Sequence, residues 1–94
     1  MIKQELLLDT KTGTATSSDV SVLRFLHKTF VLYGESVVAT AKVYGSYDGN
    51  TFVELGEIVN EGKFAVNESW NVVRATIDAY TSGTAYVAIM AIDN

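Results

Sequence analysis

The sequence predicts an all-β fold, a single antiparallel β-sandwich or jelly roll of about seven to nine short strands. The first observation is that apolar and polar residues alternate with a period of two along most of the chain. The second is that turn-forming residues recur about every 8–12 residues. A length of 94 residues suits one domain, and no repeat or linker interrupts it. We therefore expect residues 1–94 to form a single β-sandwich domain.

The N-terminal region contains one predicted strand and one irregular segment. Lys3–Asp9 reads KQELLLD and is the first expected strand. Lys11–Asp19 is small and polar, which indicates a loop or a loosely paired arm. For residues 1–19 the sequence leaves two arrangements open, a part of the sandwich or an extended N-terminal arm. An arm of this kind would be able to add a strand to the sheet edge of a neighbour.

Three further strands are predicted before the middle of the chain. Val20–His27 alternates imperfectly between apolar and polar residues. Phe30–Tyr33 is a short apolar run, which we expect to stop at Gly34–Ser36 because these residues favour turns. Val37–Tyr44 alternates clearly and is the best strand signature of this region.

The stretch Gly45–Asn50 carries the strongest turn signal. Gly49 follows Asp48, and glycine adopts positive φ at little cost while aspartate accepts hydrogen bonds from its own turn. We interpret the stretch as a hairpin corner, after which Thr51–Val59 forms the returning strand. The alternative is a calcium or sugar loop that uses Asp48 and Asn50. A calcium site needs about six to eight oxygen ligands, and the spacing of an EF-hand loop is absent.

The residue pattern of the C-terminal third predicts strands separated by turns. Asn60–Gly62 is an expected turn, and Lys63–Val66 is expected to pair back. Trp70–Asp78 alternates, and Tyr80–Gly83 is read as the turn that follows it. Thr84–Ile92 is apolar on both faces, as expected of a central strand or of one whose outer face meets a partner. Its Ala and Met content also permits a helix, but the flanking pattern favours a strand.

Composition excludes several classes of function. Charged residues make up only 19% of the chain, against about 25% in typical soluble domains, which indicates that part of the outer surface is not meant for water. The net charge of −4 and the scattered basic residues argue against a nucleic-acid partner. There is no cysteine, and the single histidine, His27, cannot form a His-rich metal site. We therefore expect no cofactor. No signal peptide and no apolar run of about 20 residues is visible, so we also expect no membrane partner.

The sequence contains no catalytic constellation, and we predict that the protein is not an enzyme. His27 would need a positioned nucleophile and an orienting carboxylate, and no nucleophile-elbow motif of the form G-x-S-x-G is present. Two acids in a cleft would suit glycoside cleavage, but a domain of this size leaves little room for a deep cleft. We therefore read Glu54, Glu57, Glu61 and Asp78 as a solvated face.

Aromatic residues are the best candidates for contacts with a partner, because Tyr and Trp are enriched at protein interfaces and stack on sugars. Trp70 is expected to cover one end of the core. Tyr44 and Tyr47 are expected to be exposed, Tyr44 on the outer face of its strand and Tyr47 in the turn. The predicted protein-contact residues are Met1, Ile2, Leu6, Tyr44, Tyr47, Tyr86 and Met90.

Three segments resemble a group of small β-sandwich proteins of tailed bacteriophages. They are Val43–Leu55 (VYGSYDGNTFVEL), Val73–Ile77 (VRATI) and Gly83–Val87 (GTAYV). The hairpin motif of the first segment is also shared with discoidin-like and carbohydrate-binding sandwiches. The resemblance covers about half of the chain, and the first forty residues have no counterpart in it.

The resemblance implies a structural protein of a phage particle, most of all a capsid decoration (cement) protein that binds the assembled shell. The implied partner is the major capsid protein or another virion protein, and a homo-oligomer such as a trimer is expected. The implied location is the capsid surface of a virion that is assembled in the host cytoplasm. The alternative is a carbohydrate-binding or receptor-binding module of a tail or fibre. That alternative predicts a glycan partner and requires Tyr44, Tyr47 and Trp70 to line one exposed face.

Overall fold

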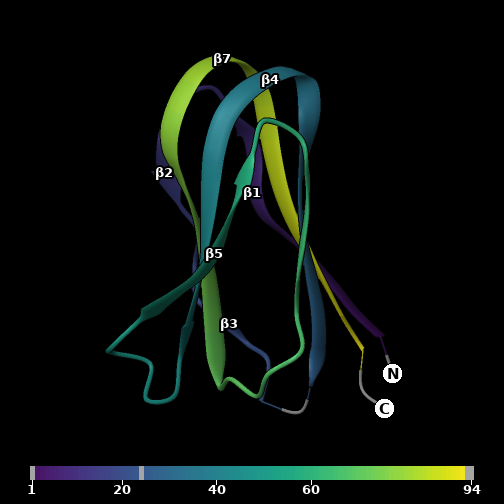
Figure 1. Cartoon of the computed structure of the whole chain (residues 1–94), viewed down its shortest axis with the longest axis vertical. Helices are drawn as coiled ribbons and strands as arrows, with labels where there is room; N and C mark the ends of the chain where they lie inside the picture. Colours follow the sequence, from purple (N-terminus) through teal and green to yellow (C-terminus); the bar gives the residue numbers. More distant parts are fainter. Residues whose placement is uncertain (1, 24, 93–94) are drawn as a thin grey trace.

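The computed structural model describes residues 2–23 and 25–92 and consists of antiparallel strands (Figure 1). The predicted all-β fold is confirmed, and the helix considered near the C-terminus is not formed. No helix in the described part of the chain is long and apolar enough to cross a bilayer. The strands are β1 (Ile2–Lys11), β2 (Ala15–Thr16), β3 (Val20–Ser21), β4 (His27–Ser46), β5 (Val53–Val59), β6 (Gly62–Val66) and β7 (Val72–Ile92).

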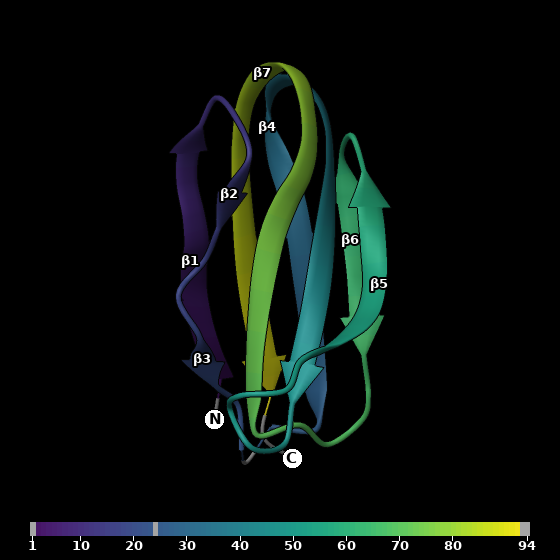
Figure 2. The same ribbon diagram turned by 90° about the vertical axis from the view of Figure 1, so that its left-hand side faces the viewer.

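Two long strands build both layers of a sandwich. β4 and β7 pair with each other along almost their whole length and arch together over one end of the molecule (Figure 1). The first layer has the order β1, residues 84–92 of β7, residues 27–35 of β4, and β6. The second layer has the order β2 with β3, residues 72–82 of β7, residues 38–46 of β4, and β5 (Figure 2). This order is that of a jelly roll.

Glycines permit the arch. Gly34 has φ 150° and Gly83 has φ 91°, and the pairing register shifts within residues 35–38. A Cβ at Gly34 would overlap the carbonyl oxygen of Thr84, and a Cβ at Gly83 would overlap that of Ser36. Only glycine therefore lets the two strands turn the corner while they remain hydrogen-bonded to each other.

The core lies between the two layers and follows the predicted alternation. Val73, Ala75 and Ile77 point inward from the second layer, as the sequence predicts. Phe64 and Trp70 close the core where they pack over glycines, Phe64 over Gly56 and Trp70 over Gly45. The fully buried side chains of the first layer include Phe30, Leu32, Val87 and Ile89.

Four local predictions are wrong, for three physical reasons. Val20–His27 is not one strand, because the chain leaves the sheet after Ser21 and re-enters it at His27. Residues 34–36 and residues 80–83 do not end their strands, since these turn-like sequences form the corner of the arch. Lys63–Val66 does not pair back onto β5. It crosses to the first layer, where β6 pairs with β4.

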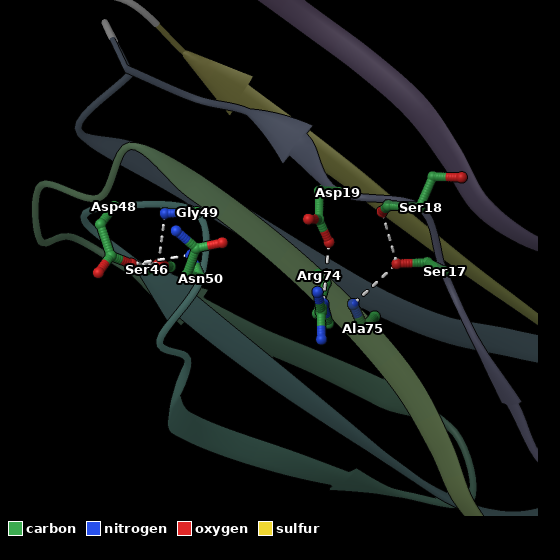
Figure 3. Close-up of polar contacts among 9 residues, drawn as sticks. All are labelled: Ser17, Ser18, Asp19, Ser46, Asp48, Gly49, Asn50, Arg74 and Ala75. Carbon is green, nitrogen blue, oxygen red and sulfur yellow. Dashed lines mark hydrogen bonds and ion pairs between the residues drawn. The ribbon is translucent and has the colours of Figure 1, made fainter.

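The N-terminal segment is part of the sandwich rather than an extended arm. β1 pairs with β7 of its own chain, beginning at Ile2 opposite Ile92. The following segment is fastened to the second layer by the Ser17 hydroxyl, which accepts a hydrogen bond from the Ala75 backbone N–H at 2.9 Å (Figure 3). Arg74 then donates to the Asp19 carboxylate at 2.9 Å. Of the two arrangements left open for residues 1–19, the described residues adopt the one within the sandwich, and Met1 lies outside them.

Candidate interaction surface

The outer side of the first layer carries a continuous surface of uncharged side chains. Strand register places Leu6 of β1 opposite Ala88 of β7, and Ala88 opposite Val31 of β4. One step along the strands, Gln4 lies opposite Met90, which in turn lies opposite Thr29. We define the apolar face as the outward side chains Leu6, Val31, Tyr33, Tyr86, Ala88 and Met90.

Two tyrosines end the apolar face near the arch. Tyr33 and Tyr86 are directly opposite each other on β4 and β7. Their ring centroids are 5.1 Å apart and the ring planes differ by 14°, so the rings stack. Cross-strand aromatic pairs of this kind stabilise a sheet and keep both rings upright on its surface. The pair is rigid and is available for contact with another molecule.

The apolar face is open to solvent and slightly hollowed. Leu6, Tyr33 and Met90 are between 40% and 47% exposed. A shallow depression of about 330 Å³ lies between the β1 and β4 side chains, with Val31 and Ala88 among the residues that line it. Isolated exposed apolar residues are ordinary, but a connected set on three neighbouring strands is typical of a protein contact.

The outer side of the second layer carries paired charges beside its exposed valines, Val38 and Val59. Lys42 lies 3.4 Å from both Glu54 and Asp78, and these acids raise the pKa of Lys42, Glu54 most. The Arg74 guanidinium lies 3.7 Å from the centre of the Phe52 ring and also pairs with an acid (Figure 3). The two outer faces therefore differ in chemistry, and the apolar face is the better candidate for a protein partner.

Three predicted contact residues, Leu6, Tyr86 and Met90, lie together on the apolar face. Tyr44 lies elsewhere, half-buried on the second layer. Tyr47 is 66% exposed at the corner after β4 and stacks on Trp70, with ring centroids 4.7 Å apart. Ile2 lies in β1, but its side chain, like the whole of Met1, falls outside the described residues.

The rings that a sugar site would need do not gather on one exposed face. Trp70 is half-buried and packs over Gly45, where it covers the end of the core as predicted. It uses one ring face against Tyr47, while Tyr44 extends from the outer side of the second layer. The arrangement required by the carbohydrate-binding alternative is therefore not the one observed.

The Asp48 turn is a hairpin corner in which one carboxylate oxygen accepts hydrogen bonds from within the turn (Figure 3). One oxygen, Oδ1, accepts hydrogen bonds from the backbone N–H groups of Asn50 and Thr51, both at 2.8 Å, and from the Ser46 hydroxyl at 3.0 Å. These contacts, that of Thr51 first, hold the pKa of Asp48 below its ordinary value. Gly49 has φ 81°, as the turn requires. The hydrogen bonds of Asp48 therefore serve the turn itself.

We expect Asp48→Ala to lower the melting temperature by about 5 °C, because the turn loses three hydrogen bonds. A carboxyl with a depressed pKa stabilises the fold above its ordinary value of 3.8, and this stabilisation is lost as the pH falls through the folded-state pKa. The Asp48→Asn variant keeps an oxygen acceptor, so its melting temperature should lie between those of the wild type and Asp48→Ala. Thermal unfolding at pH 7 and through the acid range tests this. An unchanged acid profile in Asp48→Ala would contradict it.

His27 is placed at the start of β4, where its Nδ1 lies 3.1 Å from the side-chain oxygen of Asn67. The contact is to an amide rather than to a carboxylate, which is the partner that orients a catalytic histidine. In residues 2–23 and 25–92, no group of three or more His, Asp or Glu side chains is positioned to hold a metal ion.

Val31, Tyr33 and Ala88 belong to the apolar face but were not among the predicted contacts. The sequence carried a signal for them, since Phe30–Tyr33 and Thr84–Ile92 are apolar at consecutive positions. When the buried residues of such strands alternate, their neighbours must point outward. A run that is apolar at every position therefore supplies both a core face and a contact face.

Solved structures share this fold at very low sequence identity. The SPBc2 prophage-derived protein YomS matches with a TM-score of 0.80 at 11% identity, over 97% of this chain and 92% of that one. The Yersinia pseudotuberculosis-derived mitogen matches with a TM-score of 0.59 at 11% identity, over 100% and 85% of the two chains. At such identities the likeness shows the fold alone.

A part of a larger enzyme also has this fold. CpGH89 from Clostridium perfringens, solved in complex with its substrate GlcNAc-α-1,4-galactose, matches with a TM-score of 0.61 at 10% identity. The match covers all of this chain but only 14% of that one. No family model matches the sequence, and no curated protein matches it.

Proposed function

We propose that the protein is a non-enzymatic structural protein of a phage particle, a capsid decoration protein that binds the assembled shell. The observation that carries the proposal is the apolar face on the outer side of the first layer. A connected set of exposed apolar side chains on a rigid sheet gains free energy only when another protein covers it. The second layer keeps the domain soluble, because its charges are paired and hydrated.

Two further observations support a particle protein over an enzyme. The fold is shared with a prophage-derived protein over almost the full length of both chains. The Asp48 carboxylate is engaged in its own turn, and the described contact of His27 is to an amide. The expected partner is the major capsid protein or another virion protein. Binding at many equivalent shell positions allows weak contacts to add up.

Co-sedimentation with capsids tests the proposal. The protein should pellet with expanded shells of the phage that encodes it and should not bind the free capsid subunit. Met90→Glu places a carboxylate on the apolar face and should weaken pelleting by at least about tenfold. Mass spectrometry of purified virions should find the chain in many copies. Wild-type protein that stays in the supernatant at every shell concentration would refute the proposal.

Glycan binding by the wild-type protein tests the carbohydrate-binding alternative. A glycan array should give no hits, because the described rings of Tyr44, Tyr47 and Trp70 do not form a common platform. Binding to a glycan that is lost in Tyr47→Ala would instead favour that alternative. Tyr47 is suitable for this purpose because it is exposed and lies outside the core.

A further inference from the structure

We propose that the outer edge of β1 is a strand-addition site and that its occupant is β1 of a second copy, paired antiparallel with Gln4 opposite Gln4. In the described part of the chain, β1 pairs with β7 alone and lies at the edge of the first layer (Figure 2). The contact uses the backbone of this edge and not the apolar face. It is therefore independent of whether the apolar face binds a shell.

One half of β1 is regular enough to accept another strand. Residues from Ile2 to Leu6 pair with β7 at five consecutive positions without a break in register. Beyond Leu6 the register shifts twice, and Thr10 has a positive φ of 49°. Irregularities of this kind bend an edge and protect it against unwanted strand addition. They protect the end of β1 near the arch and leave the end near Ile2 open.

The other edge strands of the described sheet are less suited to pairing with themselves. β2 and β3 have two residues each, and β6 has five. β5 has seven residues, but Glu54 and Glu57 on it are exposed. Acids on an edge strand repel the same acids of a second copy, which is a common protection of sheet edges. The regular half of β1 is therefore the best edge for a second copy.

This half of β1 is complementary to itself. Residues 2–6 read IKQEL, so the residue types follow the order apolar, basic, amide, acidic, apolar. Antiparallel pairing about Gln4 places Lys3 opposite Glu5 of the second copy, and two-fold symmetry repeats this ion pair. A shift by one residue removes both ion pairs, and a shift by two places Lys3 opposite Lys3 or Glu5 opposite Glu5. Cross-strand charges thus select one register.

Both charged side chains lie at the open side of the sandwich. Lys3 and Glu5 are in register with the buried residues Ala91 and Ile89, so they project from the inner side of β1. A depression of about 300 Å³ lies between them and β3 of the second layer. The Lys3 ammonium donates to the Ser21 carbonyl at 3.2 Å, and an ammonium has three donors, so this contact leaves others for a carboxylate.

Strand pairing joins the first layers of the two copies into one continuous layer. The two-fold axis is perpendicular to this layer, so the second layers lie on the same side and the two depressions meet at the seam. The ion pairs are then partly shielded from water, which strengthens them. The apolar faces of both copies point in the same direction on the opposite side.

The contact is small, and its affinity comes mainly from main-chain hydrogen bonds, while the side chains determine the register. We expect a dissociation constant of about 0.1–1 mM in solution. Copies that are held side by side on a surface reach effective concentrations of this order, so the same pairing would be well populated there.

Disulfide trapping tests the register, and the absence of cysteine from the chain makes the result unambiguous. Gln4→Cys places two thiols on the two-fold axis, where opposite Cα atoms are about 4.5–5.5 Å apart, within the range of a disulfide. Glu5→Cys is the matched control on the same strand. Its Cα atom would lie about 8 Å from that of the second copy, which is too far for a disulfide. Under mild oxidation, Gln4→Cys should form covalent dimers at least about tenfold faster than Glu5→Cys.

Sedimentation with charge reversal tests the pairing without cysteines. Between about 10 µM and 1 mM, the wild-type mass should rise from 10.2 kDa toward twice that value. Glu5→Lys should weaken association about fivefold, because Lys3 then faces a lysine. Combining it with Lys3→Glu restores opposite charges in reverse order and should recover association to within about twofold. Glu57→Lys makes the same change in net charge on β5 and should leave association unchanged.

Thermal unfolding confirms that each variant is folded, and the wild-type concentration series needs no variant. Equal trapping rates for Gln4→Cys and Glu5→Cys, a wild type that stays monomeric to about 1 mM, a trimer, or a charge swap without recovery each overturn the proposal. Protein that pellets with shells although Gln4→Cys is not trapped overturns the strand pairing and leaves the capsid role standing. A trapped dimer whose wild type stays in the supernatant overturns the capsid role and leaves the pairing standing.

Discussion

Gly34→Ala should destabilise the protein by about 4 kcal/mol, a large part of the roughly 5–15 kcal/mol that holds a domain of this size together. Gly34 has φ 150°, and an added Cβ would collide with the Thr84 carbonyl on the paired strand. The obstacle is backbone, which cannot turn aside as a flexible side chain can. Relief requires β4 and β7 to separate at the arch, and that separation breaks the hydrogen bonds that join the two layers.

Urea unfolding measures the effect of Gly34→Ala. The midpoint should fall by about 3 M with little change in slope. Gly13→Ala is the matched control, because a Cβ at Gly13 meets nothing within 4 Å and its φ is not positive. It should change stability by less than about 0.5 kcal/mol. A Gly34→Ala midpoint indistinguishable from that of Gly13→Ala would show that the arch tolerates a side chain.

Local patterns predict the layers of this fold but not its arch. Alternation identifies Val37–Tyr44 and Trp70–Asp78 as strands, and both predictions agree with buried inward residues. At residues 34–36 and 80–83 the same local rules predict turns, since glycine and small polar residues favour them. The structure keeps both segments extended because each finds its hydrogen-bond partners in the other. That pairing links residues about 50 positions apart in sequence, beyond the range of any local pattern.

The candidate surface was partly predictable for a related reason. Leu6, Tyr86 and Met90 are predicted contacts that the fold brings to one face, although they come from opposite ends of the chain. Their neighbours on that face come from β4, which lies between β7 and β6 only because β6 crosses layers. Composition predicts that some of the exterior avoids water. Which strands share that exterior is decided by the jelly-roll order.

Lys28 closes the end of the sandwich opposite the arch. It is 1% exposed, although lysine is almost never fully buried without partners. Its Nζ donates to the backbone carbonyls of Phe25 at 2.9 Å, Leu26 at 2.8 Å and Glu68 at 2.7 Å. One ammonium thus joins the loop before β4 to the loop before β7. No local pattern indicates this role, because VLRFLHK reads as an irregular strand.

Lys28→Met should lower the free energy of unfolding by about 3 kcal/mol. Methionine fills the space of the aliphatic part of the lysine side chain, but it leaves three carbonyls without a donor. Lys42→Met is the matched control. It removes the same charge from the solvated second layer and should cost much less. Chemical unfolding at neutral pH compares the two variants. Equal losses would mean that the charge, rather than the buried contacts, is what matters at Lys28.

The pH dependence of the unfolding free energy, compared between the wild type and Lys28→Met, separates the contacts of Lys28 from its charge. Burial lowers the pKa of Lys28 below its ordinary value of 10.5, and the nearby Glu68 carboxylate offsets only part of this effect. Between the lowered pKa and 10.5 the unfolded chain binds more protons than the folded one, so stability from Lys28 rises with pH and is complete above 10.5. Other groups titrate in this range in both proteins. The difference in unfolding free energy between wild type and Lys28→Met should therefore grow toward alkaline pH, since a neutral amine keeps two N–H donors for the carbonyls and no longer carries a buried charge. A difference that shrinks with rising pH would mean that the ammonium charge itself is what holds the two loops.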